Sequence, residues 1–308
     1  MIKVFIDGQA GTTGLQIKDK LLKHPYVELV EIDNNKRKNE AERQKMMNSV
    51  DVVFLCLPDD AAIEAVKLVT NPDTVIIDAS TAHRTNEEWT YGFPELSVEQ
   101  FDKIKNSKRI ANPGCHASGF VSIIYPLVNS GVMSADYPIT AFSITGYSGG
   151  GNKMIGDYEN PERNEELGTP RQYGLSQMHK HLPEMKKVCG LAAEPIFMPV
   201  VSDYYCGMAV SVPIFTKMLN KKLTLNEAYN LLSDFYRDSK FINVSYAPEG
   251  GFLSPLGHEG TNKMTIYVNG NDERIVLTSV FDNLGKGASS AAVENMNIAM
   301  GFDETTAL

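Results

Sequence analysis

The sequence predicts an α/β protein of two domains whose last helix returns to the first domain. Short continuous apolar runs alternate with helical stretches through the first third of the chain, which is typical of a parallel sheet covered on both faces. From about Pro138 the strand-like runs are longer and less regularly connected, which indicates an α+β domain on a mixed or antiparallel sheet. After Asp282 a small-residue stretch opens a helix that reaches about Met300 and can pack closely.

In the first domain the apolar runs predict strands at residues 2–6, 27–32, 52–57 and 74–78, and a further short strand ends near Ile110. The clearest helix between them covers residues 61–69. Ligands of such sheets bind beyond the carboxyl ends of the strands. We therefore expect one crevice to receive the segments that follow four strands, residues 8–14, 57–60, 79–84 and 112–115.

In the second domain we expect one clear helix, at residues 225–236, and a polar surface loop at 157–169. The strands are expected at residues 138–146, 195–201, 208–215, 263–268 and 275–281. We place the first domain at residues 1–114 and 284–308 and the second at residues 115–283.

Composition and charge exclude several classes of function. A net charge of -9 argues against nucleic acid as a partner, because a phosphate backbone requires a basic face. The four cysteines lie far apart with no metal-ligand spacing, which suggests neither a disulfide framework nor a metal site. The first strand begins at once, so we expect no signal peptide, and no apolar run approaches membrane-spanning length. We expect a cytoplasmic protein.

The first strand runs into a glycine turn and then a helix. Gly8, Gly11 and Gly14 let the backbone approach a pyrophosphate, and the helix N-terminus faces its charge. The spacing is G-x-x-G-x-x-G rather than G-x-G-x-x-G. The turn predicts a dinucleotide site, to which we assign Gly8, Gly11, Thr12, Thr13, Gly14, Pro58 and Ser80.

The residues alone leave open which dinucleotide binds. Asp33 lies about twenty residues past the glycine turn, where an acidic residue would hold the ribose hydroxyl of NAD. A basic group follows it, Lys36, Arg37, Lys38 and Arg43, which could hold the 2′-phosphate of NADP or be a solvated helix start.

Cys115 is the candidate nucleophile. It follows a Pro113-Gly114 turn and begins a stretch that reads as a helix, where unpaired backbone N–H groups and the helix dipole favour a thiolate. The alternative is a small buried residue that fills a turn.

Two histidines and a carboxylate, His179, His181 and Glu184, are candidates for proton transfer. Imidazole exchanges protons near neutral pH, and a carboxylate can fix its tautomer. A third metal ligand is not evident, so metal binding is disfavoured. His116 beside the cysteine is a competing base with poorer geometry, because adjacent helical residues point about 100° apart. Arg84, at a strand end, is the candidate for gripping a phosphate.

Together these segments resemble the N-acetyl-gamma-glutamyl-phosphate reductase family of arginine biosynthesis, in its shorter type, over essentially the whole chain. The sequence departs from the family at His116-Ala117-Ser118, where an aromatic residue usually follows the cysteine. The matching segments are residues 7–14 (DGQAGTTG), 55–60 (LCLPDD), 78–84 (DASTAHR), 91–95 (YGFPE), 112–115 (NPGC), 148–151 (SGGG), 179–184 (HKHLPE) and 282–288 (DNLGKGA).

The resemblance implies a Rossmann domain, a substrate and oligomerisation domain, NADPH as cofactor and the reduction of an acyl phosphate. It implies that Cys115 is the nucleophile, which would form a thioester and release inorganic phosphate, and that His179 is the acid/base. We further expect Ser148, His181 and Glu184 at the substrate, Gly285 and Lys286 at the cofactor, and a homodimer or homotetramer.

Three other functions remain open. An enzyme that reduces an aminoadipyl phosphate carried on a protein would keep every motif above, although it should favour a more basic docking face. A semialdehyde dehydrogenase acting on aspartyl phosphate shares the chemistry but resembles the sequence less. A non-catalytic NADP-binding redox sensor would use Cys115 but would not require His179 or Arg84.

Overall fold

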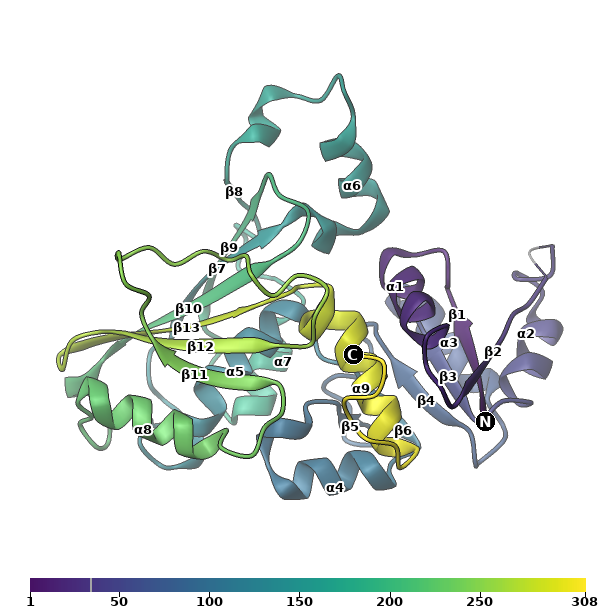
Figure 1. The fold of residues 1–308 in the computed structure, drawn as a ribbon, viewed down its shortest axis with the longest axis horizontal. Helices are drawn as coiled ribbons and strands as arrows, with labels where there is room; N and C mark the ends of the chain where they lie inside the picture. The colour runs from purple at the N-terminus through teal and green to yellow at the C-terminus, as the bar shows by residue number, and fades with distance from the viewer. Residues whose placement is uncertain (34) are drawn as a thin grey trace. The chain divides into compact units, whose positions relative to one another are not determined.

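The computed structural model describes residues 1–33 and 35–308, and these residues form two compact units (Figure 1). The first unit comprises Met1–Pro113 and Ala288–Leu308, and the second comprises Gly114–Gly287. The second unit thus includes Gly114 and residues 284–287, which the sequence assigns to the first domain. The predicted boundaries of the folding domains stay a prediction.

The first unit contains a six-stranded parallel sheet of order β2-β1-β3-β4-β6-β5, as the apolar runs predict. The register pairs Val4 with Val52, and Phe54 with Ile77. The strands are β1 Ile2–Asp7, β2 Val27–Val30, β3 Val52–Leu55, β4 Val75–Asp78, β5 Thr90–Tyr91 and β6 Arg109–Ala111.

Helix α9 (Ser290–Ala299) packs against α1, α4 and β4 of the first unit (Figure 1). Its side chains are buried almost throughout, and Val293 and Met296 join the same apolar core as Val4 and Ile77. This confirms that the C-terminal helix returns to the first unit. The other helices of the unit are α1 Thr12–Leu21, α2 Glu40–Met47, α3 Asp59–Leu68 and α4 Val98–Asn106.

The second unit contains a seven-stranded mixed sheet of order β11-β12-β13-β10-β7-β9-β8. Two neighbouring pairs, β11 with β12 and β7 with β9, are parallel, and the other pairs are antiparallel. The mixed sheet was one of our two expectations. The strands are β7 Thr140–Gly146, β8 Arg171–Gln172, β9 Ile196–Ser202, β10 Met208–Phe215, β11 Ile242–Tyr246, β12 Met264–Gly270 and β13 Arg274–Phe281.

Helices cover one face of this sheet. Helix α5 (Cys115–Asn129) packs on β10 and β13. Gly119 permits this close approach, since a Cβ there would lie only 2.5 Å from the Cγ2 atom of Val210. Helix α8 (Leu225–Phe235) packs on β11 and β12 and begins at a capping box between Thr224 and Glu227. The remaining helices are α6 Gly151–Glu159 and α7 Leu182–Cys189.

Two local predictions hold only in part. The loop expected at residues 157–169 is largely exposed, but its first three residues end α6, and Glu165–Gly168 form a 3-10 turn. The helix expected from Asp282 to about Met300 is present, but its first turn, Gly285–Ser289, is π-helical, and the Gly287 amide donates to the Asp282 carbonyl. Among the described residues, no helix is long and apolar enough to cross a membrane.

Candidate active site

Asn112, which follows β6, is fixed by hydrogen bonds on every side. Its carbonyl accepts from the Arg84 Nε atom at 2.9 Å, and its Nδ2 atom donates to the Ala288 carbonyl at 2.9 Å. Its Oδ1 atom accepts from Asn295 at 3.2 Å. The side chain is only 1% exposed. These bonds hold Asn112, three residues before the cysteine, in place.

Cys115 is the first residue of α5, as the sequence predicts. The preceding residue, Gly114, is extended and is the N-cap of the helix. Because glycine has no side chain, it cannot cap the N–H groups of the first turn. The amide of Gly114 donates to the Glu184 Oε1 atom at 2.8 Å. Glu184 is 1% exposed and therefore anchors the backbone beside the cysteine. Its expected contact with substrate stays a prediction.

Three histidines lie together in the second unit. The ring centroid of His116 is 5.4 Å from that of His179 and 5.6 Å from that of His181, and those two are 4.8 Å apart. The nitrogens of His116 face two hydroxyls, Ser143 Oγ at 2.8 Å and Tyr173 Oη at 2.6 Å. Sequence reasoning missed both hydroxyls, because neither lies in a motif or near the cysteine in the chain.

Burial keeps His116 and His179 neutral. Burial first and the nearby Lys180 charge second lower the pKa of His179 to about 4. Burial and then the charge of His179 lower the pKa of His116 to about 3. The Nδ1 atom of His179 accepts from the backbone amide of His181 at 3.2 Å, which leaves the ring proton of His179 on Nε2.

The low pKa of His116 predicts how stability depends on pH. Between about pH 6.5, where an exposed histidine titrates, and about pH 3, the unfolded chain binds a proton that the folded chain does not. This contribution is therefore complete above pH 6.5 and is lost as the pH falls. We expect the melting temperature to decrease from pH 6.5 to 4.5, and to decrease less in His116→Phe. Differential scanning fluorimetry measures both slopes, and an equal or steeper slope in the variant would contradict the assignment.

Ser148, Gly285 and Lys286 lie in the second unit. The Ser148 Oγ atom, 1% exposed, accepts from the Asn283 amide at 3.0 Å. Lys286 is also 1% exposed, and its Nζ atom lies 5.3 Å from the ring centroid of Phe241. The substrate contact of Ser148 and the cofactor contacts of Gly285 and Lys286 stay predictions.

The glycine turn of the first unit has the form that a pyrophosphate site requires. Gly8 has a φ of +89°, and a Cβ there would lie 2.3 Å from the Cys56 carbonyl oxygen. A Cβ at Gly14 would lie 2.6 Å from the Gly8 carbonyl oxygen. Gly11 is the N-cap of α1, which begins at Thr12. A bare turn that ends in a helix N-terminus fits a dinucleotide phosphate, which Gly8, Gly11, Thr12, Thr13 and Gly14 would hold.

Two glycines of this turn offer a matched test. The methyl group of Gly14→Ala clashes with the Gly8 carbonyl oxygen. We expect this variant to have a melting temperature lower by several degrees and to lose cofactor binding. Gly11→Ala meets the same carbonyl at an ordinary 3.5 Å and should leave the melting temperature within about a degree. Fluorimetry and cofactor titration measure both. Equal stability of the two variants would show that the turn does not require Gly14.

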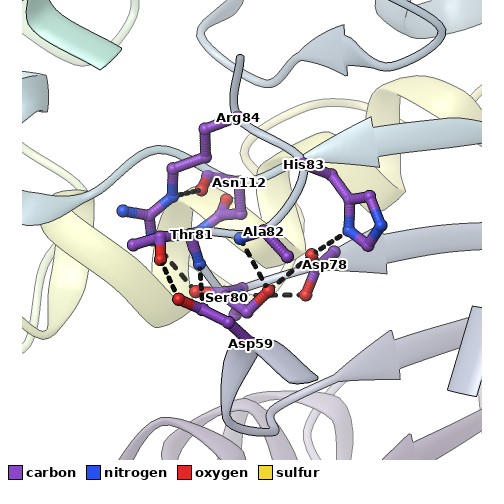
Figure 2. Close-up of polar contacts among 9 residues, drawn as sticks. Asp59, Asp78, Ser80, Thr81, Ala82, His83, Arg84 and Asn112 are labelled. Atoms are coloured by element: carbon purple, nitrogen blue, oxygen red, sulfur yellow. Dashed lines mark hydrogen bonds and ion pairs between the residues drawn. The ribbon is translucent and has the colours of Figure 1, made fainter. Parts of the chain in front are cut away.

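Figure 2 shows the polar cluster at the carboxyl end of β4. Asp78 accepts from the Ser80 hydroxyl at 2.7 Å and bonds the His83 Nδ1 atom at 2.6 Å. The His83 ring stacks on Trp89 with centroids 4.1 Å apart. The cluster fixes the loop that carries Ser80, and Pro58 is the N-cap of the neighbouring helix α3. The cofactor contacts of Ser80 and Pro58 stay predictions.

Arg84 is 9% exposed and donates to two backbone carbonyls, those of Asn112 and of Ala79 at 3.0 Å (Figure 2). It therefore braces the segment before the cysteine, a role that sequence reasoning missed. Its assignment to a substrate phosphate stays a prediction.

Arg43, from the basic group that could hold a 2′-phosphate, forms an ion pair with Asp7 at 2.6 Å beside the glycine turn. Lys36 pairs with Glu42 at 3.2 Å. Over residues 1–33 and 35–308, no group of histidine, cysteine, aspartate or glutamate side chains could hold a metal ion.

Comparison with known proteins identifies two domains in the chain. Residues 3–104 match the family model "semialdehyde dehydrogenase, NAD binding domain", and residues 115–283 match "semialdehyde dehydrogenase, dimerisation domain". The chain is 43% identical to N-acetyl-gamma-glutamyl-phosphate reductase 2 of Nostoc sp. over 99% of each chain. It is 44% identical to N-acetyl-gamma-glutamyl-phosphate reductase of Mesorhizobium japonicum, over 97% of this chain and 99% of that one. The chain belongs to the N-acetyl-gamma-glutamyl-phosphate reductase family.

Solved structures share the fold of this N-acetyl-gamma-glutamyl-phosphate reductase family member. Aspartate semialdehyde dehydrogenase from Francisella tularensis matches 97% of this chain and all of its own with a TM-score of 0.74, at 15% identity. The enzyme from Candida albicans, solved with NADP, matches 97% of this chain and 98% of its own with a TM-score of 0.66, also at 15% identity. The predicted fold class and family resemblance are confirmed.

Proposed function

We propose that this protein reduces N-acetyl-L-glutamyl 5-phosphate with NADPH to N-acetyl-L-glutamate 5-semialdehyde and inorganic phosphate, in arginine biosynthesis in the cytoplasm. The observation that carries the proposal is the match to reductases of this name along nearly the whole of both chains. The relatives give no support to the aminoadipyl substrate or to a non-catalytic sensor.

Cys115 is assigned the nucleophilic role. Its thiolate attacks the acyl carbon, phosphate leaves from the tetrahedral intermediate, and a thioester remains. The position at the start of α5 supports this assignment, because the N–H groups of the first turn can stabilise the oxyanion. The bond from the Gly114 amide to Glu184 orients that turn. NADPH, when bound, supplies the hydride that reduces the thioester carbonyl.

His179 is assigned the proton-donating role. Its ring is neutral above about pH 4, with the proton on Nε2, so it can donate a hydrogen bond to the carbonyl oxygen as negative charge develops there. A neutral donor does not require acid conditions. Collapse of the hemithioacetal then releases the semialdehyde and returns the cysteine thiolate.

The reaction run backwards tests the proposal. Purified protein is mixed with N-acetylglutamate semialdehyde, NADP and phosphate, each omitted in turn, with NAD as a second cofactor, and absorbance of the reduced nicotinamide is followed. We expect turnover that requires phosphate and prefers NADP. Turnover without phosphate would indicate an ordinary aldehyde dehydrogenase, and no turnover would refute the substrate assignment.

We also propose that the second unit pairs with a second copy of itself through the sheet face opposite α5. Val210 lies under α5 at Gly119, and side chains alternate along a strand, so Ser211 and its cross-strand partner Phe142 point away from the helix. Apolar side chains from four strands lie on that face, and the match to a dimerisation domain supports a second copy as its occupant. Its apolar members are Phe142, Ile144, Ile196, Met198, Pro213, Phe215 and Val276.

Charges on this face should separate the subunits. Phe142 is 40% exposed and Ile196 is 56% exposed, so Phe142→Glu with Ile196→Glu should fold but should not tolerate burial against a second copy. We expect this variant to elute as a monomer in size-exclusion chromatography with light scattering. Phe252→Glu, at a 90% exposed site outside the sheet, should leave the oligomer intact. A double variant with wild-type mass would refute this interface.

A further inference from the structure

Ser143, His116 and Tyr173 form a chain of hydrogen bonds that takes no part in the proposed reaction steps. Tyr173 follows β8, His116 is the second residue of α5, and Ser143 lies on β7. The bonds run from Ser143 Oγ to His116 Nδ1 at 2.8 Å, and from His116 Nε2 to Tyr173 Oη at 2.6 Å. All three residues belong to the second unit.

The count of protons selects one tautomer of His116. The ring is neutral and carries one N–H, so the three groups hold three protons for two hydrogen bonds. Ser143 is 0% exposed. Among the described residues, its hydroxyl forms a hydrogen bond with His116. If His116 donated to Ser143, the serine proton would be buried without an acceptor, at a cost of about 1–3 kcal/mol.

The opposite arrangement moves the proton that lacks an acceptor from the fully buried serine to the partly buried Tyr173. Ser143 donates to His116 Nδ1, and His116 Nε2–H donates to the oxygen of Tyr173. The phenol proton of Tyr173 is then free to point away from His116. Tyr173 is less buried than Ser143 or His116, and Cys115 directly precedes His116, whose ring bonds the Tyr173 hydroxyl. Burial first and the charge of Cys115 second raise the pKa of the phenol.

We propose that Ser143 and His116 are positioning residues that direct the hydroxyl of Tyr173 so that it donates a hydrogen bond to the sulfur of Cys115. The hydroxyl stabilises the thiolate before it attacks and after the semialdehyde leaves. The inference rests on the role of Cys115 in the proposed function. It also gives a physical use to His116, at the position where the sequence departs from the usual aromatic residue.

Other titratable groups surround this chain of bonds. The rings of His179 and His181 face His116, and the ring of His179 lies 5.9 Å from that of Tyr173. Lys180 acts on His179, and Glu184 bonds the Gly114 amide beside the cysteine. A pH profile of Cys115 therefore has to be compared between variants that leave these groups in place.

The test is the rate at which iodoacetamide alkylates Cys115 in the protein without cofactor or substrate, measured from pH 5 to 10 by mass spectrometry of the peptide that contains it. In Tyr173→Phe the ring remains and the donor is lost. We expect the midpoint of the profile to rise by about one pH unit, and the rate at neutral pH to fall about tenfold, because a hydrogen bond to a charged group is lost.

His116→Phe should shift the midpoint in the same direction, and the double variant should shift it no further than the larger single change. Ser143→Ala, which keeps both rings, should produce a smaller shift of the same sign and serves if His116→Phe does not fold. Tyr246→Phe is the matched control, because the Tyr246 hydroxyl bonds Asn226 at 2.8 Å elsewhere in the second unit.

A Tyr173→Phe profile that coincides with wild type would overturn the proposal, as would additive shifts in the double variant. A Tyr173→Phe shift without any shift in His116→Phe or Ser143→Ala would also overturn it, because the two residues would then not direct the hydroxyl. The measurement needs no substrate. If the wild-type protein lacks the expected reductase activity but Tyr173→Phe shifts the alkylation profile, only the proposed function is refuted. If the wild-type protein is active but Tyr173→Phe leaves the profile unshifted, only this inference is refuted.

Discussion

Cys115→Ala is expected to abolish turnover while cofactor binding remains at the wild-type level. The thioester forms on this sulfur, so its loss removes the covalent route and should lower kcat on the order of 10⁴-fold or more. Alanine suits the first turn of a helix, so the fold should be preserved. Phosphate-dependent NADP reduction measures the loss, and fluorescence titration with NADPH measures the retained binding.

Mass spectrometry distinguishes a lost nucleophile from a misplaced one. Without NADPH, the wild-type protein should accumulate an acyl adduct on Cys115 when mixed with the acyl phosphate, and Cys115→Ala should show none. Cys206→Ala is the matched control, because burial first and Asp282 second raise the pKa of that thiol to about 12, which keeps it protonated. Adduct formation or normal turnover in Cys115→Ala would refute the mechanism.

The parallel sheet and the start of α5 could be predicted because their signals are local. Continuous apolar runs such as residues 52–55 fit a strand buried on both faces, and the structure buries all four. The start of α5 at Cys115 follows from the Pro113-Gly114 turn. Helix α6 could not be predicted in the same way, because it begins at a glycine that follows two others, and glycine has low helix propensity.

The contacts around the candidate site could not be predicted, because they join residues far apart in the chain. Glu184 and Gly114 are 70 residues apart, and His116 and Tyr173 are 57 apart. Sequence indicates that Glu184 is a carboxylate near two histidines, but only the fold brings it to the amide before the cysteine. The same limit applies to Arg84, whose guanidinium bonds the carbonyl of Asn112 from 28 residues away.

His179→Ala is expected to lower kcat about 10²–10³-fold, because it removes the N–H that faces the developing negative charge. His179→Gln keeps an amide donor and should recover part of the loss. Because burial and Lys180 lower the pKa of His179 to about 4, its neutral form persists from pH 8 down to about pH 5. Protonation of His179 should therefore not reduce the wild-type activity until the pH approaches 4.

Steady-state rates from pH 5 to 8 separate this role from that of a histidine that works near its ordinary pKa of about 6.5. Met178→Ala, an 84% exposed neighbour in the same turn, should keep wild-type activity and controls for disturbance of the loop. An ionisation near pH 6.5 that disappears in His179→Ala would contradict the neutral-donor assignment. Equal losses in His179→Ala and His179→Gln would show that the imidazole acts as a base, since an amide can donate a hydrogen bond but cannot accept a proton at these pH values.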